Sequence, residues 1–252
     1  LMHVTRDVRP RVRVQAQPGG FTSMPTNGHA SYSSAYRAMV LANRTAMREA
    51  EDVGVRCVWA IARLLDLRWE MCTYRPEKDV HISASIQRSG AWEPAMVRQM
   101  LLALRAHPNS TLIDIGGNIG YYALAAAVDG HAVHTFEPVP LNAAMMQRSI
   151  ARNRLRGITL HTMALGDRVQ EVPMGTDDTN QGGVSHDLQK NKGAAHSMTM
   201  LPAVPLDMLL KAPTSPLYIK IDIEGAECVA FRGMADFLRT APSIVGMNME
   251  FA

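Results

Sequence analysis

The sequence predicts an α/β fold, in which a doubly wound and mostly parallel sheet follows an N-terminal helical extension. Three observations lead to this prediction: short apolar runs typical of buried strands, helical periodicity between them, and a glycine-rich turn after the first run. Strands that alternate with helices at this spacing form parallel sheets. We expect strands at 111–115, 132–136, 158–161, 217–223 and 243–249, and helices at 119–128, 141–155 and 226–238.

Three regions are expected along the chain. Residues 1–34 are rich in Arg, Pro, Gly and Ser without hydrophobic periodicity, which predicts a disordered or loosely attached leader. Residues 35–79 form the helical extension, because an apolar stripe at helical spacing runs to about residue 67. Residues 80–252 form the main domain. We also expect short strands at 71–74 and 80–86, and a helix that starts near Pro94 and runs to about Arg105.

Composition and charge narrow the class of protein. The chain has 252 residues, of which 47% are hydrophobic and 19% charged, as in ordinary globular domains. No apolar run approaches the roughly 18 residues of a membrane-spanning helix, so we expect no stable membrane insertion. Residues 1–110 carry 15 Lys and Arg against 9 Asp and Glu, whereas residues 111–252 carry 11 against 14. The acidic second part does not favour nucleic-acid binding.

The cysteines predict no covalent framework. Cys57, Cys72 and Cys228 are odd in number, far apart and never in CxxC spacing, so neither a disulfide framework nor a zinc site is expected. This usage fits a reducing compartment. Because no secretory signal is visible either, we expect a cytoplasmic protein.

The glycine-rich turn is the strongest local motif. The apolar strand at 111–115 contains Asp114 and leads through Gly116, Gly117 and Gly120 into the next helix. Glycines let a ligand approach the backbone, and the helix start offers free N–H donors. About half of such turns are only tight turns, so the motif needs support from the next strand.

That support is a carboxylate, Glu137, which follows the second strand 17 residues after Gly120. A doubly wound fold places an acid there to accept hydrogen bonds from ribose hydroxyls. A dinucleotide turn would need glycine at Asn118, and Asp114 would repel a pyrophosphate. S-adenosylmethionine carries an ammonium and a sulfonium and no phosphate, so the acidic turn favours it over a dinucleotide.

Charged residues alternate with isoleucines from Ile219 to Glu224, in a strand that the fold makes central. Charges in such a strand belong at its functional carboxyl end, so Asp222 and Glu224 are the first candidates for a general base. They could instead bind the substrate or hold a cation, and Lys220 could pair with one of them structurally. Glu227 is expected to cap a helix or lie on the surface, and Glu250 to line an acceptor pocket.

A long polar segment, 174–197, separates the third strand from the later ones. Loops of this length inside a compact domain are usually functional or disordered, and we favour a substrate lid. His186 and His196 are second candidates for the base, because an unperturbed histidine titrates near neutral pH.

These motifs together resemble the FkbM-type methyltransferases, a family of class I, Rossmann-like enzymes. The resemblance covers roughly residues 80–250 and is ordered along the chain. It rests on Ile113–Tyr122, Phe136-Glu137-Pro138, Ala164–Asp167, Leu206-Asp207, Ile219–Glu227 and Met249-Glu250, with Gly90–Glu93 ahead of them.

The resemblance implies methyl transfer from S-adenosylmethionine to a hydroxyl of a sugar, polyketide or other small molecule. It places the methionine part of the cofactor at Asp114, Gly116, Gly117 and Gly120, with Asn118 fixing the turn or touching the cofactor. It places the ribose at Glu137 and the adenine edge near Met163 and Ala164. No metal ligand set is assigned, and the oligomeric state is left open.

Two alternative functions stay open from the sequence alone. One is a non-catalytic S-adenosylmethionine-binding scaffold, and the other is an NAD(P)-dependent oxidoreductase. Members of the family normally continue with further strands at the sheet edge, whereas this chain stops at Ala252. The resemblance therefore predicts a chain truncated at its C-terminus or an edge completed from elsewhere.

Overall fold

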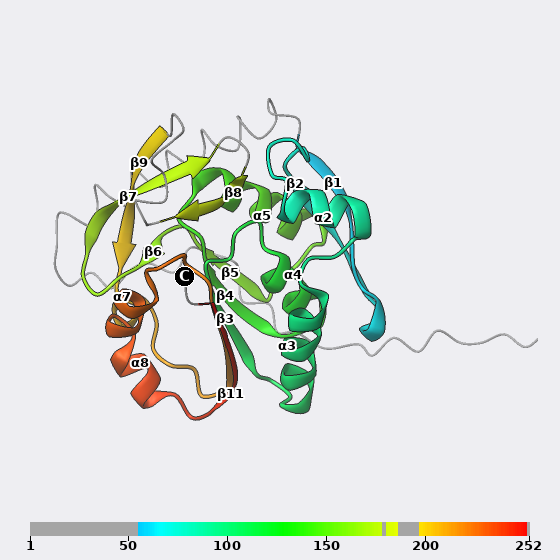
Figure 1. The fold of residues 1–252 in the computed structure, drawn as a ribbon. Coiled ribbons are helices and arrows are strands. Elements are labelled where there is room, and N and C mark those ends of the chain that lie inside the picture. The colour runs from blue at the N-terminus through cyan, green and yellow to red at the C-terminus, as the bar shows by residue number, and fades with distance from the viewer. Residues whose placement is uncertain (1–54, 178–179, 186–196, 251–252) are drawn as a thin grey trace, which may run out of the picture.

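A computed structural model describes residues 55–177, 180–185 and 197–250, and it has the predicted parallel sheet (Figure 1). Five strands lie in the order β11-β10-β3-β4-β5, and every neighbouring pair is parallel. The predicted doubly wound α/β core is therefore confirmed. The strands are β3 (Thr111–Ile115), β4 (Ala132–Phe136), β5 (Ile158–His161), β10 (Leu217–Ile221) and β11 (Ile244–Met249).

Alternate residues of the central strands pack into two separate apolar clusters, one on each face of the sheet. Leu112, Val133 and Tyr218 join the cluster under α3 (Pro94–Ala106), α4 (Tyr121–Val128) and α5 (Pro140–Arg152). Ile113, Phe136 and Ile219 join the opposite cluster, with α6 (Leu206–Leu209), α7 (Glu227–Arg232) and α8 (Ala235–Thr240). This alternation is what a sheet covered on both faces requires.

Two expected helical or strand segments differ in detail. The helix expected at 226–238 is two helices, which end and begin on either side of Gly233 and Met234. Gly233 packs so closely on another loop that an added Cβ would lie 1.8 Å from the Gly166 carbonyl oxygen. The strand expected at 80–86 is instead the helix α2 (Ile82–Ser89). Its start is fixed by the buried Asp79 carboxylate, which accepts hydrogen bonds from the N–H groups of His81, Ile82 and Ser83.

The helical stripe expected to run to about residue 67 is wrong over residues 56–67, because residues 56–73 form an antiparallel hairpin of β1 (Arg56–Ala62) and β2 (Leu67–Thr73) around the 3-10 turn η1 (Arg63–Leu65). The short strand expected at 71–74 is confirmed as the last part of β2. β1 contains the strand-favouring residues Val58, Trp59 and Ile61, and pairing buries Trp69 and Met71 of β2 in the core of the sheet domain. Tertiary packing thus overrides the helical spacing. The leader and residues 35–54 lie outside the described residues.

A second, four-stranded sheet occupies much of the segment that was expected to be a loop. Its order is β6-β9-β7-β8, and β7 pairs with β9 from Gln170–Ala203 to Thr176–Ser197. This backbone pairing is not visible in a polar, glycine-rich sequence. The strands are β6 (Ala164–Leu165), β7 (Gln170–Asp177), β8 (Asn180–Ser185) and β9 (Ser197–Val204). His186 and His196 fall outside the described residues, so the lid stays a prediction.

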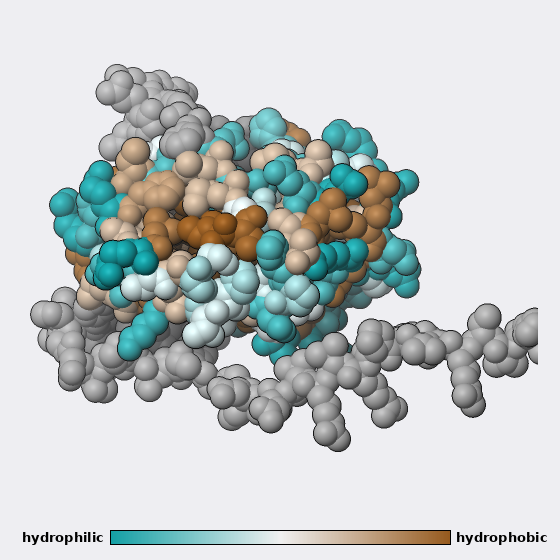
Figure 2. All heavy atoms as spheres, turned by 90° about the horizontal axis from the view of Figure 1, so that it is seen from below, coloured by the Kyte–Doolittle hydropathy of each residue, from teal (hydrophilic) through white to brown (hydrophobic). Residues whose placement is uncertain are grey.

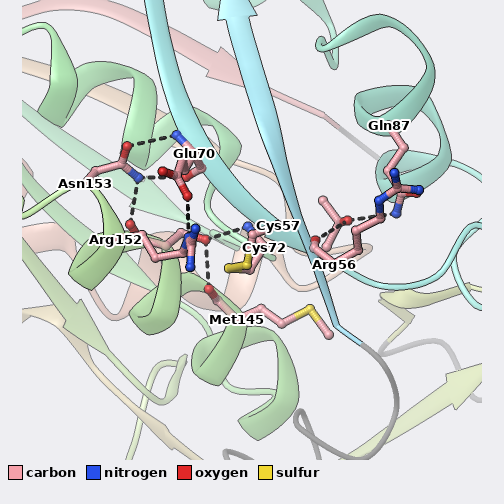
Figure 3. Close-up of a disulfide and its surroundings, with 10 residues drawn as sticks. Arg56, Cys57, Glu70, Cys72, Gln87, Met145, Arg152 and Asn153 are labelled. Atoms are coloured by element: carbon pink, nitrogen blue, oxygen red, sulfur yellow. Dashed lines mark hydrogen bonds and ion pairs between the residues drawn. A yellow bond between two sulfur atoms is a disulfide. The ribbon is translucent and has the colours of Figure 1, made fainter.

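A disulfide joins Cys57 and Cys72, which contradicts the expectation of no disulfide (Figure 3). The two cysteines are direct partners across β1 and β2, so the hairpin itself brings them together. Their pairing was hidden because the hairpin was not predicted. The disulfide also removes the cysteine argument for a reducing compartment and a cytoplasmic location, and Cys228 is free and exposed.

Polar contacts bind the disulfide-bonded hairpin to α5. The Cys72 N–H donates to the Ser149 hydroxyl at 2.9 Å, and Arg152 forms an ion pair with Glu70. Asn153 accepts a hydrogen bond from the Glu70 N–H and donates one to the Glu70 carbonyl (Figure 3). The hairpin is therefore fixed to α5, the helix that follows β4.

An apolar band crosses one face of the described part of the chain (Figure 2). Figure 2 views the side on which α3 and α8 end and β11 begins in Figure 1, and apolar residues cross it between hydrophilic flanks. Ile244 and Met247 of β11 are among the exposed large apolar residues. Within the described ranges β11 is one of the two edge strands of the sheet, and β5 is the other. None of the helices in those ranges is both long and apolar enough to cross a bilayer.

We predict that alkylation with iodoacetamide modifies only Cys228 in the unreduced protein and all three cysteines after reduction and unfolding. The disulfide closes a loop with a sequence separation of 15, so its loss should lower the free energy of unfolding by about 3 kcal/mol. Peptide mass spectrometry locates the modified residues, and a Cys228→Ser variant is the control. Labelling of Cys57 without reductant would contradict the assignment.

Candidate active site

A cavity of about 410 Å³ opens at the carboxyl ends of the central strands. This is the edge at which doubly wound sheets bind ligands. Its wall combines the turn after β3, the segments after β4, β10 and β11, and Met174 of β7. The polar residues that line it are His81, Trp92, Glu93, Asn118, Glu137, Asn142, Asp222, Glu224 and Glu250.

A second cavity of about 230 Å³ adjoins the first. The two cavities share Glu93, Asp222 and Glu250 in their walls. The remaining lining residues of the smaller cavity are Met96, Tyr122, Lys220, Ile221, Asn248 and Met249. Two ligands could therefore occupy neighbouring sites with these carboxylates between them.

Packing explains the glycines of the turn. An added Cβ at Gly116 would lie 1.8 Å from the Asp222 carbonyl oxygen, and at Gly117 it would lie 2.1 Å from the Thr135 hydroxyl. At Gly120 it would lie 2.6 Å from Met146. Gly116 lines the larger cavity, whereas Gly117 and Gly120 line neither cavity. Gly117 and Gly120, which were predicted to bind the cofactor, thus pack against Thr135 and Met146 and allow the turn to form, without lining either cavity.

Glu137 is buried against the turn and faces the larger cavity. Its carboxylate accepts hydrogen bonds from the N–H groups of Asn118 and Val139, both at 2.8 Å, and from the Asn142 amide at 3.3 Å. Burial raises the pKa of Glu137 to about 7, although these donors oppose the shift. Asn118, held at a φ of +51°, therefore fixes both the turn and the carboxylate.

Asp114 lies beneath the turn and lines neither cavity. Its side chain is fully buried, and one carboxylate oxygen accepts a hydrogen bond from the Thr135 hydroxyl at 3.2 Å. The other oxygen has no hydrogen-bond partner among the described residues and lies 3.9 Å from the Lys220 ammonium. Burial raises the pKa of Asp114, and Lys220 opposes this shift.

These groups belong to a polar row that crosses four strands. Asn248, Lys220, Asp114 and Thr135 are consecutive register partners from β11 to β4, so their side chains lie on one face of the sheet. The Lys220 ammonium donates to the Gly116 carbonyl at 2.9 Å and to Asp222 at 3.3 Å. Burial lowers the pKa of Lys220, but Asp114 and Asp222 raise it above its usual value.

Comparison with known proteins shows which family the chain belongs to. The Methyltransferase FkbM domain matches residues 114–251, which is more than half of the chain. The chain belongs to the FkbM methyltransferase family. It is also 25% identical over 148 residues to Methyltransferase 1 of Beauveria bassiana (strain ARSEF 2860). That match covers 51% of this chain and 59% of the relative, so the chain spans less than two thirds of the relative's length.

The carboxylates predicted from the β10 segment take different positions in this member of the FkbM methyltransferase family. Asp222 lines both cavities, whereas Glu224, at a φ of +52°, lines only the larger one. Glu250 lines both cavities, as expected of a pocket residue. Glu227 is buried and accepts a hydrogen bond from the Gly225 N–H, so it caps the turn before α7 and does not lie on the surface.

The walls of the two cavities also contain residues that sequence analysis missed. His81, Met174 and Asn248 line the cavities without any motif that marks them. Glu93 was noted only as the last residue of the Gly90–Glu93 motif in the family resemblance; it lines both cavities, and the Tyr122 hydroxyl donates to it at 2.6 Å.

Other predicted groups lie away from the cavities. Ala164 pairs with Ala203 in the second sheet and lines neither cavity. In the ranges that the structure describes, no group of three or more His, Cys, Asp and Glu side chains could hold a metal ion.

We predict that Lys220→Met lowers the free energy of unfolding of the protein by about 3–5 kcal/mol, because it leaves Asp114 buried without its counter-ion. Denaturant titration measures this, with Lys211→Met, at an exposed lysine, as the matched control. Adding Asp114→Asn to Lys220→Met should restore part of the loss. A single variant as stable as the unmodified protein would show that the pair does not support the fold.

Proposed function

We propose that this methyltransferase transfers a methyl group from S-adenosylmethionine to a hydroxyl oxygen of a small molecule. The observation that carries the proposal is the buried Glu137 carboxylate, which faces a carboxylate-lined cavity beside the glycine turn. In this proposal the larger cavity takes the cofactor and the smaller one takes the acceptor. The family supports the methyl transfer, and the residues of the two cavities support the assignment of each ligand.

The larger cavity suits a cationic nucleoside. Glu93, Glu137, Asp222, Glu224 and Glu250 line it, and no Lys or Arg from the described part of the chain lies in its wall. A positively charged ligand is therefore attracted, whereas the pyrophosphate of a dinucleotide would face five carboxyl groups. The volume of about 410 Å³ is within the range of small-molecule sites. These properties fit S-adenosylmethionine better than NAD(P).

The residues that would hold the cofactor follow from the walls of the cavity. Glu137 would accept hydrogen bonds from the ribose hydroxyls, and Gly116 and Asn118 would contact the methionine part. Asp114, Gly117 and Gly120 would act from beneath by holding the turn. Ala164 would contact the adenine only if that ring extended past the described cavity.

When bound, S-adenosylmethionine supplies an electrophilic methyl group. The chain then has to position the acceptor hydroxyl in line and remove its proton. Asp222 is our first candidate for the base, because it lines both cavities and so can reach an acceptor beside the cofactor. Glu224 is the second candidate, and it lines the cofactor cavity alone.

Calorimetric titration with S-adenosylhomocysteine, the demethylated product, tests cofactor binding. We expect the unmodified protein to bind it and not NAD, and Glu137→Gln to lose about tenfold to 100-fold in affinity, as for a hydrogen bond to a charged group.

The affinity for S-adenosylhomocysteine should also depend on pH. The ribose hydroxyls of the ligand donate hydrogen bonds and so favour the ionised form of Glu137. The affinity should therefore rise as pH increases through about 7, and this dependence should vanish in Glu137→Gln. Glu171→Gln, at an exposed site on β7, is the control. Tight binding of NAD instead would refute the assignment.

Methyl transfer itself is tested with isotope-labelled S-adenosylmethionine and a cell extract, with mass spectrometry of the labelled products. With the acceptor so identified, Asp222→Asn should lower kcat by about 10²–10⁴-fold while S-adenosylhomocysteine binding is retained. Glu224→Gln should have a smaller effect, because Glu224 does not line the acceptor cavity. Equal kcat in Asp222→Asn and the unmodified enzyme would exclude Asp222 as the base.

A further inference from the structure

The hydroxyl of Tyr74 links the N-terminal hairpin to Glu137, the carboxylate proposed to bind the ribose. Tyr74 directly follows β2, is only 2% exposed, and precedes the residues 114–251 that match the family. Its hydroxyl donates to the side-chain oxygen of Asn142 at 2.7 Å. The side-chain nitrogen of Asn142 donates in turn to Glu137 at 3.3 Å. All three side chains are buried, so they form a row of hydrogen bonds shielded from water.

The fold fixes Tyr74 opposite Asn142. β2 packs along α5, and the Cys72 N–H donates to the Ser149 hydroxyl at 2.9 Å (Figure 1). Ser149 and Asn142 lie about two turns apart on one face of α5, so both meet the same extended segment. On the other side, the Tyr74 carbonyl accepts a hydrogen bond from the Gln87 side chain of α2 at 2.7 Å. Tyr74 is therefore held between two helices.

The Tyr74 hydroxyl determines which end of the Asn142 amide faces Glu137. A buried hydroxyl needs an acceptor, and the amide oxygen of Asn142 supplies it. The amide nitrogen is thereby directed toward Glu137, where it donates to the carboxylate. The reverse orientation would set the amide oxygen against that carboxylate, which accepts and cannot donate when ionised. Burial raises the pKa of Tyr74 well above its usual value, so the hydroxyl stays a donor at neutral pH.

Asn142 is the adjustable donor to Glu137. Among the described residues, Glu137 accepts from the backbone N–H groups of Val139 and Asn118 and from the side chain of Asn142. Burial raises the pKa of Glu137 to about 7, and each of these three donors lowers it. The backbone donors are fixed by the turn and by α5, whereas an amide side chain can rotate. Its orientation therefore affects how much of Glu137 is ionised near neutral pH.

We propose that Tyr74 is a positioning residue for the cofactor site, because it holds the Asn142 amide in the orientation that keeps Glu137 ready to accept hydrogen bonds from the ribose. The proposal rests on the proposed function and adds to it a residue from outside the matched domain. Tyr74 lines neither cavity, so it acts through Asn142 and not by contact with a ligand. The segment between β2 and α2 is thus part of the cofactor site.

The first test follows the titration of Glu137 in the free protein by nuclear magnetic resonance of ¹³C-labelled glutamate carboxyl groups, with Glu137→Gln to identify the signal. In Tyr74→Phe the Asn142 amide is released, so the pKa of Glu137 should rise by about one pH unit, as for a lost hydrogen bond to a charged group. Tyr121→Phe is the matched control, because this buried hydroxyl also bonds to the hairpin, at Ile61, and lines neither cavity. An unchanged pKa in Tyr74→Phe, or an equal rise in the control, would overturn the proposal.

Other charged groups near Glu137 are the same in all these variants. Lys220 lowers the pKa of Glu137, and Asp79 acts on Tyr74 from the segment before α2. The remaining carboxylates of the cavity wall are Glu93, Asp222, Glu224 and Glu250. A difference between the variants therefore reports the row of hydrogen bonds and not these charges.

The second test is titration with S-adenosylhomocysteine at two pH values. Tyr74→Phe should lower the affinity by up to about tenfold near pH 6, where less of Glu137 is ionised in the variant. Near pH 8.5 the loss should be less than about twofold, because most of Glu137 is then ionised in both proteins. A purely structural tyrosine would instead give equal losses at both pH values, and that result, or no loss at either, would refute the role of Tyr74.

A double variant separates this role from effects on folding. Tyr74→Phe/Asn142→Leu replaces both ends of their hydrogen bond by apolar groups, so neither end is left buried without the other. Its Glu137 pKa should equal that of Asn142→Leu alone, since Tyr74 acts through Asn142, and additive shifts would contradict this. If S-adenosylhomocysteine does not bind the unmodified protein, the proposed function fails, while the carboxyl titration still tests the link from Tyr74 to Glu137. Binding with the same pH dependence in Tyr74→Phe refutes this inference alone.

Discussion

The buried charge of Lys220 is the interaction on which the architecture of the site depends. Its ammonium lies between Asp114 and Asp222 and donates to the Gly116 carbonyl, so it joins two strands to the glycine turn. A buried ammonium is tolerated only where such partners replace water. Because Gly116 packs directly against the Asp222 backbone, the turn and the segment after β10 hold each other in place. The walls of both cavities follow from this arrangement.

Much of the sheet could be predicted because its signals are local. Apolar runs flanked by glycine and proline located β3, β4 and β5 to the residue, and the order of motifs along the chain indicated the methyltransferase family. The position of Glu137 followed from the fold, since carboxyl ends of parallel strands meet at one edge. The positions of Asp222 and Glu250 in the cavity walls could be predicted for the same reason, because each follows a parallel strand.

What could not be predicted depends on contacts between distant residues. The hairpin at 56–73 and its disulfide need the packing of Trp69 and Met71 against the core, which no local pattern reports. Asp114 carries the expected motif, yet its burial beneath the turn follows from register with Lys220. Asn248 sits in an apolar strand without a motif, and only the pairing of β10 with β11 shows that it extends the same polar row.

The most direct test of the account is a crystal structure of the complex with S-adenosylhomocysteine. The account predicts the nucleoside in the larger cavity, with its ribose hydroxyls hydrogen-bonded to Glu137 and the Lys220 ammonium still bound to the Gly116 carbonyl. A nucleoside bound elsewhere, or a ribose that makes no contact with Glu137, would contradict it.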